Sequence, residues 1–125
     1  MGKAVTAFQP AEVRERLLRS YGTARITDTT ICELAAIDQE LARIVRNGYA
    51  EDWGESTPGA VCFGAAILDG AGTAVAAVSV SMPRIRFDSE SQQHSLIATV
   101  RATAAEISKA LAAGRRWGRQ SGRRL

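Results

Sequence analysis

Three small polar side chains near the middle of the sequence, Cys62, Ser79 and Ser81, are candidates for holding a small ligand. A catalytic interpretation would combine Cys62 with His94 and Asp52 as a nucleophilic set, or let these three share a metal ion, but no local motif supports either. His94 is the only histidine, which excludes metal motifs with two histidine ligands, and no glycine-rich phosphate loop is present. The sequence therefore favours a binding protein over an enzyme, with no cofactor and no metal.

A predicted β-hairpin carries these three residues. Two apolar segments, 61–68 and 73–81, are joined by Asp69-Gly70-Ala71-Gly72, and short apolar runs around a glycine-containing turn are typical of a hairpin. Alternation along a strand makes one face bulky and the other small and edged with polar groups. The bulky face of the first strand carries Val61, Phe63, Ala65 and Ile67, and the small face of the hairpin carries Cys62, Gly64, Ala66, Val75, Ala77, Ser79 and Ser81. Either a closely packed helix or a small ligand could fill the space over the small face.

Helices account for most of the remaining chain. One is predicted from Pro10 to about Gly22, and a second begins at the capping box Thr30-Ile31-Cys32-Glu33 and ends at Asn47-Gly48. A short strand follows at 49–52. The apolar spacing after the hairpin predicts a long helix that is capped by Asp88 or Ser89 and ends at Gly114. On the second helix, the residues predicted to share one buried face are Leu34, Ile37, Leu41, Ile44 and Val45.

The segment GYAEDWGESTPGAVCFGAAILDGAGTAVAAVSVSMP (48–83) resembles the effector-binding domain of IclR-type bacterial transcription regulators. That family has a Gly-Tyr pair after a helix, an acidic stretch, a glycine shortly before a cysteine, and a hairpin that ends in Ser-x-Ser-x-Pro. The matching residues here are Gly48-Tyr49, Glu51-Asp52, Gly59 with Cys62, and Ser79-Val80-Ser81-Met82-Pro83. The similarity extends from Gly2-Lys3-Ala4 to the last helix, although Trp53-Gly54 departs from the more acidic run of the family.

This resemblance implies an α+β fold in which an antiparallel sheet is flanked by helices, as in GAF and profilin-like domains. It also implies that Asp52, Cys62, Ser79 and Ser81 line an effector pocket. Serine hydroxyls donate to a carboxylate or carbonyl group, and a thiol tolerates polar and apolar atoms, so a small organic acid is the expected effector. Because Asp52 would repel a second carboxylate, it must be protonated, face a ligand hydroxyl or accept from a ligand donor.

The family's mode of action implies a homo-oligomer, dimeric or tetrameric, whose subunit arrangement responds to the effector. Family members reach DNA through a winged helix-turn-helix domain, which is absent from this sequence, as is the part of the effector domain that precedes Gly2. We therefore expect a truncated domain, incomplete at its N-terminus, with an exposed sheet edge, an apolar face and a tendency to associate. Two alternatives stay open: an oligomerisation or interaction domain without a ligand, and a GAF-like sensor domain of a signalling protein.

Length and charge define the predicted domain. The 125 residues suffice for one domain, and 46% hydrophobic with 23% charged residues is an ordinary globular composition. No apolar run could span a bilayer and no signal peptide is evident, so we expect a cytoplasmic protein without membrane contact, with Cys32 and Cys62 reduced. Residues 1–114 form the predicted effector-binding domain and carry a net charge of −2. Residues 115–125 form a basic, disordered tail, which is either a solvated extension or a contact for nucleic acid.

Overall fold

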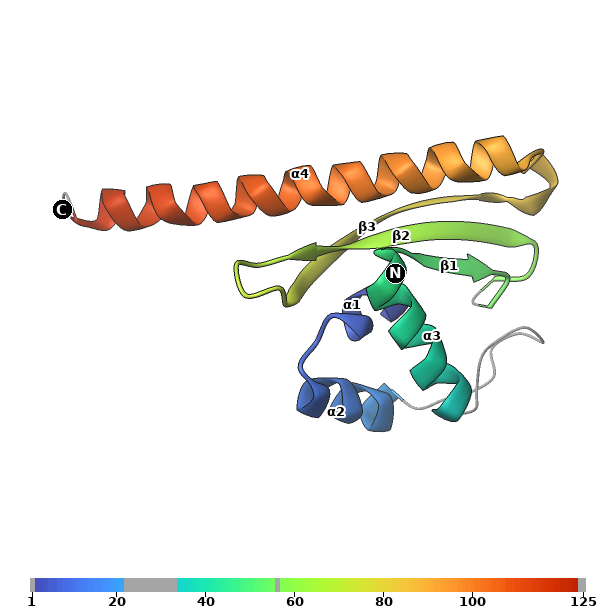
Figure 1. Cartoon of the computed structure of the whole chain (residues 1–125), viewed down its shortest axis with the longest axis horizontal. Helices are drawn as coiled ribbons and strands as arrows, with labels where there is room; N and C mark the ends of the chain where they lie inside the picture. Colours follow the sequence, from blue (N-terminus) through green and yellow to red (C-terminus); the bar gives the residue numbers. More distant parts are fainter. Residues whose placement is uncertain (1, 22–33, 56, 124–125) are drawn as a thin grey trace.

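The protein forms one antiparallel sheet with helices on both faces. The computed structural model describes residues 2–21, 34–55 and 57–123. In chain order the elements are α1 (Gly2–Ala7), α2 (Ala11–Tyr21), α3 (Leu34–Asn47), β1 (Ala50–Trp53), β2 (Ala60–Leu68), β3 (Ala74–Pro83), the 3₁₀ turn η1 (Arg84–Arg86) and α4 (Glu90–Arg123). The strands lie in the order β1-β2-β3; α4 covers one face of the sheet, and α1 and α3 lie on the other (Figure 1). The predicted α+β fold is confirmed.

Strands β2 and β3 form the predicted hairpin. Their turn is closed by Asp69, whose Oδ1 accepts the backbone N–H groups of Ala71 at 2.9 Å and Thr73 at 3.0 Å. Gly72 has φ of +83°, a left-handed conformation that glycine adopts without strain. The register of the two strands shifts between Ile67 and Leu68. From Ile67 to the pair Ala60–Pro83 the strands are paired without interruption.

The bulky face of β2 packs against α4. Val61 and Phe63 are 0% and 1% exposed and contact Ile97, while Ala65 and Ile67 lie in a second cluster under α4. The ring of Phe63 also meets Trp53 edge to face, with centroids 5.9 Å apart. These contacts confirm the predicted alternation and hold the long helix across the hairpin.

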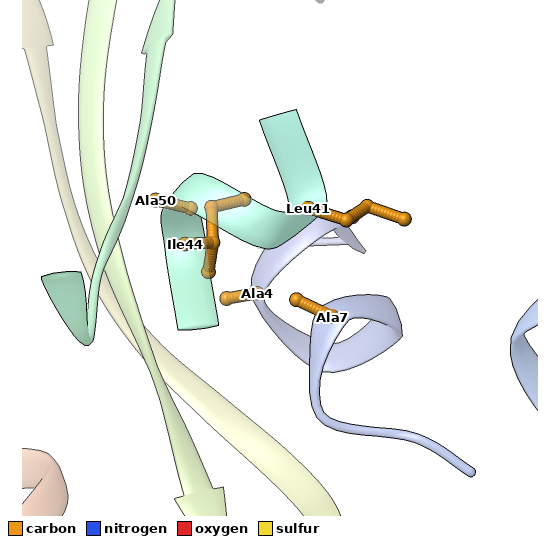
Figure 2. Close-up of a cluster of buried hydrophobic side chains, with 5 residues drawn as sticks. All are labelled: Ala4, Ala7, Leu41, Ile44 and Ala50. Carbon is orange, nitrogen blue, oxygen red and sulfur yellow. The ribbon is translucent and has the colours of Figure 1, made fainter. Parts of the chain in front are cut away.

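The small face of the sheet is covered in part by α1 and α3. Figure 2 shows the buried cluster of Ala4, Ala7, Leu41, Ile44 and Ala50, against which Ala66 of β2 also packs. Alanine side chains let α1 approach the sheet closely, so the closely packed helix is the correct interpretation for this part of the face. Val45, predicted to be buried on the same face of α3, is instead 48% exposed. It lies one residue past Ile44, which rotates it by about 100° away from the sheet.

Two helix boundaries test the sequence signals. Ser89 caps α4, because its Oγ accepts the N–H of Gln92 at 3.1 Å. The predicted end at Gly114 is wrong: α4 continues to Arg123, so the backbone of 115–123, assigned above to a disordered tail, is the last part of this helix. Gly114 does not have the positive φ that ends a helix, and a helical glycine costs only about 1 kcal/mol relative to alanine. The capping box at Thr30 and Cys32 lies outside the described residues.

Candidate functional site

The four predicted site residues lie together on the small face of the sheet. Asp52 of β1 is the register partner of Cys62 in β2, and Cys62 is the partner of Ser81 in β3, so these three form one row across all strands. Ser79 lies in the neighbouring row, opposite Gly64. Residues directly opposite on one face have Cβ atoms about 5 Å apart, so a single small molecule could contact all four.

This end of the small face is accessible to solvent. Asp52, Cys62 and Ser79 are half-buried and Ser81 is exposed. The six-residue helix α1 packs against Ala66 and against Ala50, and Ala50 is in the same row as Gly64 and Ser79. A thiol and two hydroxyls at this degree of exposure remain available to a ligand.

A cluster of charged side chains adjoins Asp52 and fixes the turn that follows it. Asp52 Oδ1 accepts the backbone N–H of Glu55 at 2.7 Å, and Glu55 Oε2 in turn accepts Lys3 Nζ at 2.7 Å. Lys3 Nζ also donates to the backbone carbonyl of Glu51 at 2.6 Å and to Glu40 Oε1 at 3.2 Å. Lys3 therefore joins α1 to α3, to β1 and to the loop beside Asp52.

Arg43 completes this cluster from the next turn of α3. Its Nη2 and Nε donate to the two carboxylate oxygens of Glu40 at 2.6 and 3.2 Å, and its Nη1 lies 3.7 Å from Glu51 Oε1. Burial alone would raise the pKa of Glu40, but hydrogen bonds and charge attraction from Arg43 and Lys3 hold this pKa below its ordinary value. Glu40 is therefore a charged anchor between two cations.

The sequence analysis did not single out Lys3, Glu40 or Arg43 as members of a site. Glu40 and Arg43 are three residues apart on one helix, a spacing that predicts their pairing. No sequence pattern predicts the partners of Lys3, because these partners are 37, 48 and 52 residues away in the chain.

The structure does not bring together Cys62, His94 and Asp52, the catalytic set considered in the sequence analysis. Asp52 and Cys62 are neighbours, but His94 is exposed on α4, which covers the opposite face of the sheet. Within the described ranges, no three histidine, cysteine or acidic residues gather closely enough to bind a metal ion.

None of the helices in the described part of the chain is both long and apolar enough to cross a membrane.

Comparison with known proteins finds matches to the C-terminal part of bacterial transcription regulators. Residues 1–109 match the sequence profile described as bacterial transcriptional regulator IclR C-terminal. The HTH-type transcriptional regulator BhcR of Paracoccus denitrificans is 42% identical over 86 residues, which are 69% of this chain and 31% of BhcR. The chain thus spans about a third of this relative.

Solved structures agree with the sequence comparison. The IclR crystal structure from Thermotoga maritima superposes with a TM-score of 0.82 at 31% identity, covering 89% of this chain and 44% of that one. The inducer-binding domain of PobR from Acinetobacter, solved as a double mutant with 3-hydroxybenzoic acid, has the same fold, with a TM-score of 0.76 at 21% identity over 86% of this chain and 61% of that one.

Proposed function

Because the chain belongs to the IclR family of bacterial transcriptional regulators, as their C-terminal domain, we propose that it senses a small organic acid through Asp52, Cys62, Ser79 and Ser81. Its relatives are transcription regulators and not enzymes, so the domain has a regulatory role. The observation that carries the proposal is the row Asp52–Cys62–Ser81 with Ser79 in the next row, since none of these four residues is fully buried.

The chemistry of the row suits an acid that carries a second polar group. The hydroxyls of Ser79 and Ser81 donate to the ligand carboxylate at the β3 side of the row. Asp52 lies at the other end, two strands away, where it accepts from a ligand hydroxyl rather than opposing the carboxylate. Cys62 lies between them and contacts the apolar body of the ligand. A hydroxy acid such as the 3-hydroxybenzoic acid held by PobR has this arrangement of groups.

Regulation then follows from linkage. The acid stabilises whichever arrangement of subunits binds it more tightly, and it shifts the oligomer by no more than that difference in affinity. In the longer relatives, named as helix-turn-helix regulators, such a shift would change how DNA-binding domains are spaced. We assign this protein the same role, as a cytoplasmic homo-oligomer that reaches DNA only through a helix-turn-helix domain.

Isothermal titration calorimetry with 3-hydroxybenzoate, pyruvate and 2-oxoglutarate tests the proposal. We expect heat of binding for at least one acid, and a loss of at least about tenfold in affinity for the double variant Ser79→Ala/Ser81→Ala, because each removed hydroxyl leaves the carboxylate without a donor. Ser91→Ala, an exposed serine on α4, is the matched control and should bind as the unaltered protein does. Absence of heat with all three acids would argue against the proposed ligand class, and equal affinity of the double variant for an acid that binds would show that the two serines are not part of its binding site.

A further inference from the structure

A groove opens beside the start of β1, between the end of α3, strand β2 and α4. The pairing of β1 with β2 begins at Ala50 opposite Gly64, so within the described sheet no strand lies beside Ala65 to Leu68 on that side of β2. The groove has a volume of about 650 Å³, which is in the range of small-molecule sites. It lies on the β1 side of β2, so the outer edge of β3 does not contribute to it.

This groove is separate from the candidate ligand site. It is not lined by any of the four predicted site residues. Along β2 it begins at Ala65, three residues past Cys62, and it continues to Asp69 in the hairpin turn. A molecule bound here would therefore be a second ligand, distinct from the acid proposed above.

Small side chains keep the groove open and give it an apolar floor. Ser108 lies among them, but its hydroxyl already accepts the N–H of Leu68 and donates to the carbonyl of Ala104. Polar recognition in the groove therefore comes from the charged residues that line it. The alanines of the floor are Ala65, Ala66, Ala104, Ala105 and Ala112.

Three cations line the groove: Arg46 on the last turn of α3, and Arg101 and Lys109 on α4. All three are exposed, and none of them forms an ion pair with another residue that the structure describes. Arg43, one turn before Arg46, differs in this respect, because it pairs with Glu40 at 2.6 Å. The charge of the three groove cations is thus not neutralised by the described part of the chain.

The acidic residue that lines the groove, Asp69, is engaged in the hairpin turn. Its Oδ1 accepts the backbone N–H of Ala71 at 2.9 Å and that of Thr73 at 3.0 Å. Three positive charges against this one negative charge leave the groove with a net charge of +2. A concave surface with such an excess attracts anions, and an anion with two negative charges would neutralise it.

Both arginines belong to the α3 end of the groove. Arg101 Nε lies 3.3 Å from the point where a Cβ on Gly48 would lie, so this side chain reaches from α4 to the residue that follows α3. Arg46 precedes Gly48 by two residues. Lys109 lies eight residues past Arg101, which is about 12 Å further along α4. The groove therefore has two arginines at one end and a lysine toward the other.

We propose that this groove binds an organic phosphate, with the phosphate group between Arg46 and Arg101 and the apolar body on the alanine floor. Guanidinium groups hold phosphate oxygens by paired hydrogen bonds, and a phosphate dianion accepts such pairs from two arginines at once. A carboxylate has two oxygens and one negative charge, so it matches only one arginine. Lys109 contacts the far end of the ligand.

Isothermal titration calorimetry with 1-naphthyl phosphate and adenosine monophosphate tests the proposal. We expect a Kd of about 1 mM or tighter for at least one of them, and binding of inorganic phosphate, which has no apolar body, that is at least about tenfold weaker. Arg46→Gln and Arg101→Gln should each weaken binding of the organic phosphate at least about tenfold. Arg86→Gln, which removes an exposed arginine of η1 outside the groove, is the matched control and should bind as the unaltered chain does.

Filling the groove gives a test that leaves the charges in place. Ala105 and Ala102 are both exposed on α4, but only Ala105 lines the groove. Ala105→Leu should therefore weaken binding of 1-naphthyl phosphate at least about tenfold, while Ala102→Leu should not change it. In the unaltered chain, the amide resonances of Gly48, Ala105 and Lys109 should shift as the same ligand is added.

The proposal fails if neither organic phosphate binds up to about 10 mM, or if inorganic phosphate binds as tightly as they do. Equal affinity of Arg101→Gln and Arg86→Gln, or of Ala105→Leu and Ala102→Leu, would also overturn it. Titration with 1-naphthoate separates this groove from the proposed acid site, because an acid held by Ser79 and Ser81 should not respond to Arg101→Gln. Naphthoate binding that depends on Arg101 and is as tight as that of 1-naphthyl phosphate would refute the assignment to phosphates.

Discussion

Replacing Lys3 with methionine tests whether the charged cluster beside Asp52 holds the domain together. Lys3 Nζ donates to Glu55, to the Glu51 carbonyl and to Glu40, and its side chain is only 27% exposed. Methionine keeps the length of the side chain and removes all three hydrogen bonds. The Lys3→Met variant therefore loses the ion pairs of Lys3 with Glu55 and Glu40, while Arg43 still pairs with Glu40.

The expected loss of unfolding free energy lies between the values for breaking a surface ion pair and a buried ion pair. Fully exposed pairs contribute about 0 to 1 kcal/mol, and breaking a buried pair costs about 3 to 5 kcal/mol. Glu40 and Glu55 are 16% and 15% exposed, so partial solvent screening places Lys3→Met at about 2 kcal/mol of unfolding free energy. For a domain of this size that corresponds to about 6 to 9 °C in Tm.

Urea denaturation followed by circular dichroism measures this difference, with Arg19→Met as the matched control. Arg19 also pairs with a glutamate, Glu15, at 3.4 Å, but the two side chains are 81% and 66% exposed. Its removal should change the unfolding free energy by less than about 0.5 kcal/mol. Equal midpoints for Lys3→Met and Arg19→Met, with unchanged m values, would refute the reasoning that partial burial makes the Lys3 cluster strong.

Three other changes have expected outcomes. Gly48→Ala should destabilise by about 1 to 2 kcal/mol in thermal melts, because φ is +80°, whereas Gly70→Ala, with open space and no positive φ, should be nearly neutral. Ser108→Ala should lower the unfolding free energy, measured by urea denaturation, by about 1 to 2 kcal/mol, and it should speed amide exchange at Leu68, whose N–H loses its acceptor. Unchanged exchange at Leu68 would contradict this prediction. The pKa of Glu40 is lower in the folded protein than its ordinary 4.5, so its ionisation stabilises the fold above that pH, and this contribution is lost as pH falls through the folded pKa. The difference in unfolding free energy between the unaltered protein and Glu40→Gln should therefore shrink from pH about 6 to pH about 3.

The hairpin and its two faces could be predicted from the sequence, because a hairpin and the alternation of its side chains depend on residues that are close together in the chain. Strand alternation placed Cys62, Ser79 and Ser81 on one face, and the turn residues fixed which strands pair. Gly48 was predicted to end α3 in the left-handed region and has φ of +80°. The expected exposed sheet edge and the tendency to associate stay predictions.

Features that depend on distant partners could not be predicted in this way. Nothing near Lys3 in the sequence indicates that α3 and the loop after β1 meet at its ammonium group. Gly114 has the residue type of a helix end, but a glycine ends a helix only when its backbone turns left-handed, which Gly114 does not do. The row formed by Asp52, Cys62 and Ser81 needed the pairing of β1 with β2, which only the resemblance had implied.

The hydroxyl of Ser108 determines how α4 can move. It accepts the N–H of Leu68 at 3.0 Å while donating to Ala104 at 2.8 Å, so it pins the helix at one point along the strand. Sliding α4 by one residue along the strand would shift Ser108 by about 1.5 Å and turn it by about 100°, which would break its bond to Leu68. A movement of the sheet that keeps the bond between Ser108 and Leu68 would reach α4 as a tilt about Ser108. From Ser108 the helix continues to Arg123, about 22 Å further along its axis (Figure 1), so a tilt of about 5° would displace that end by about 2 Å.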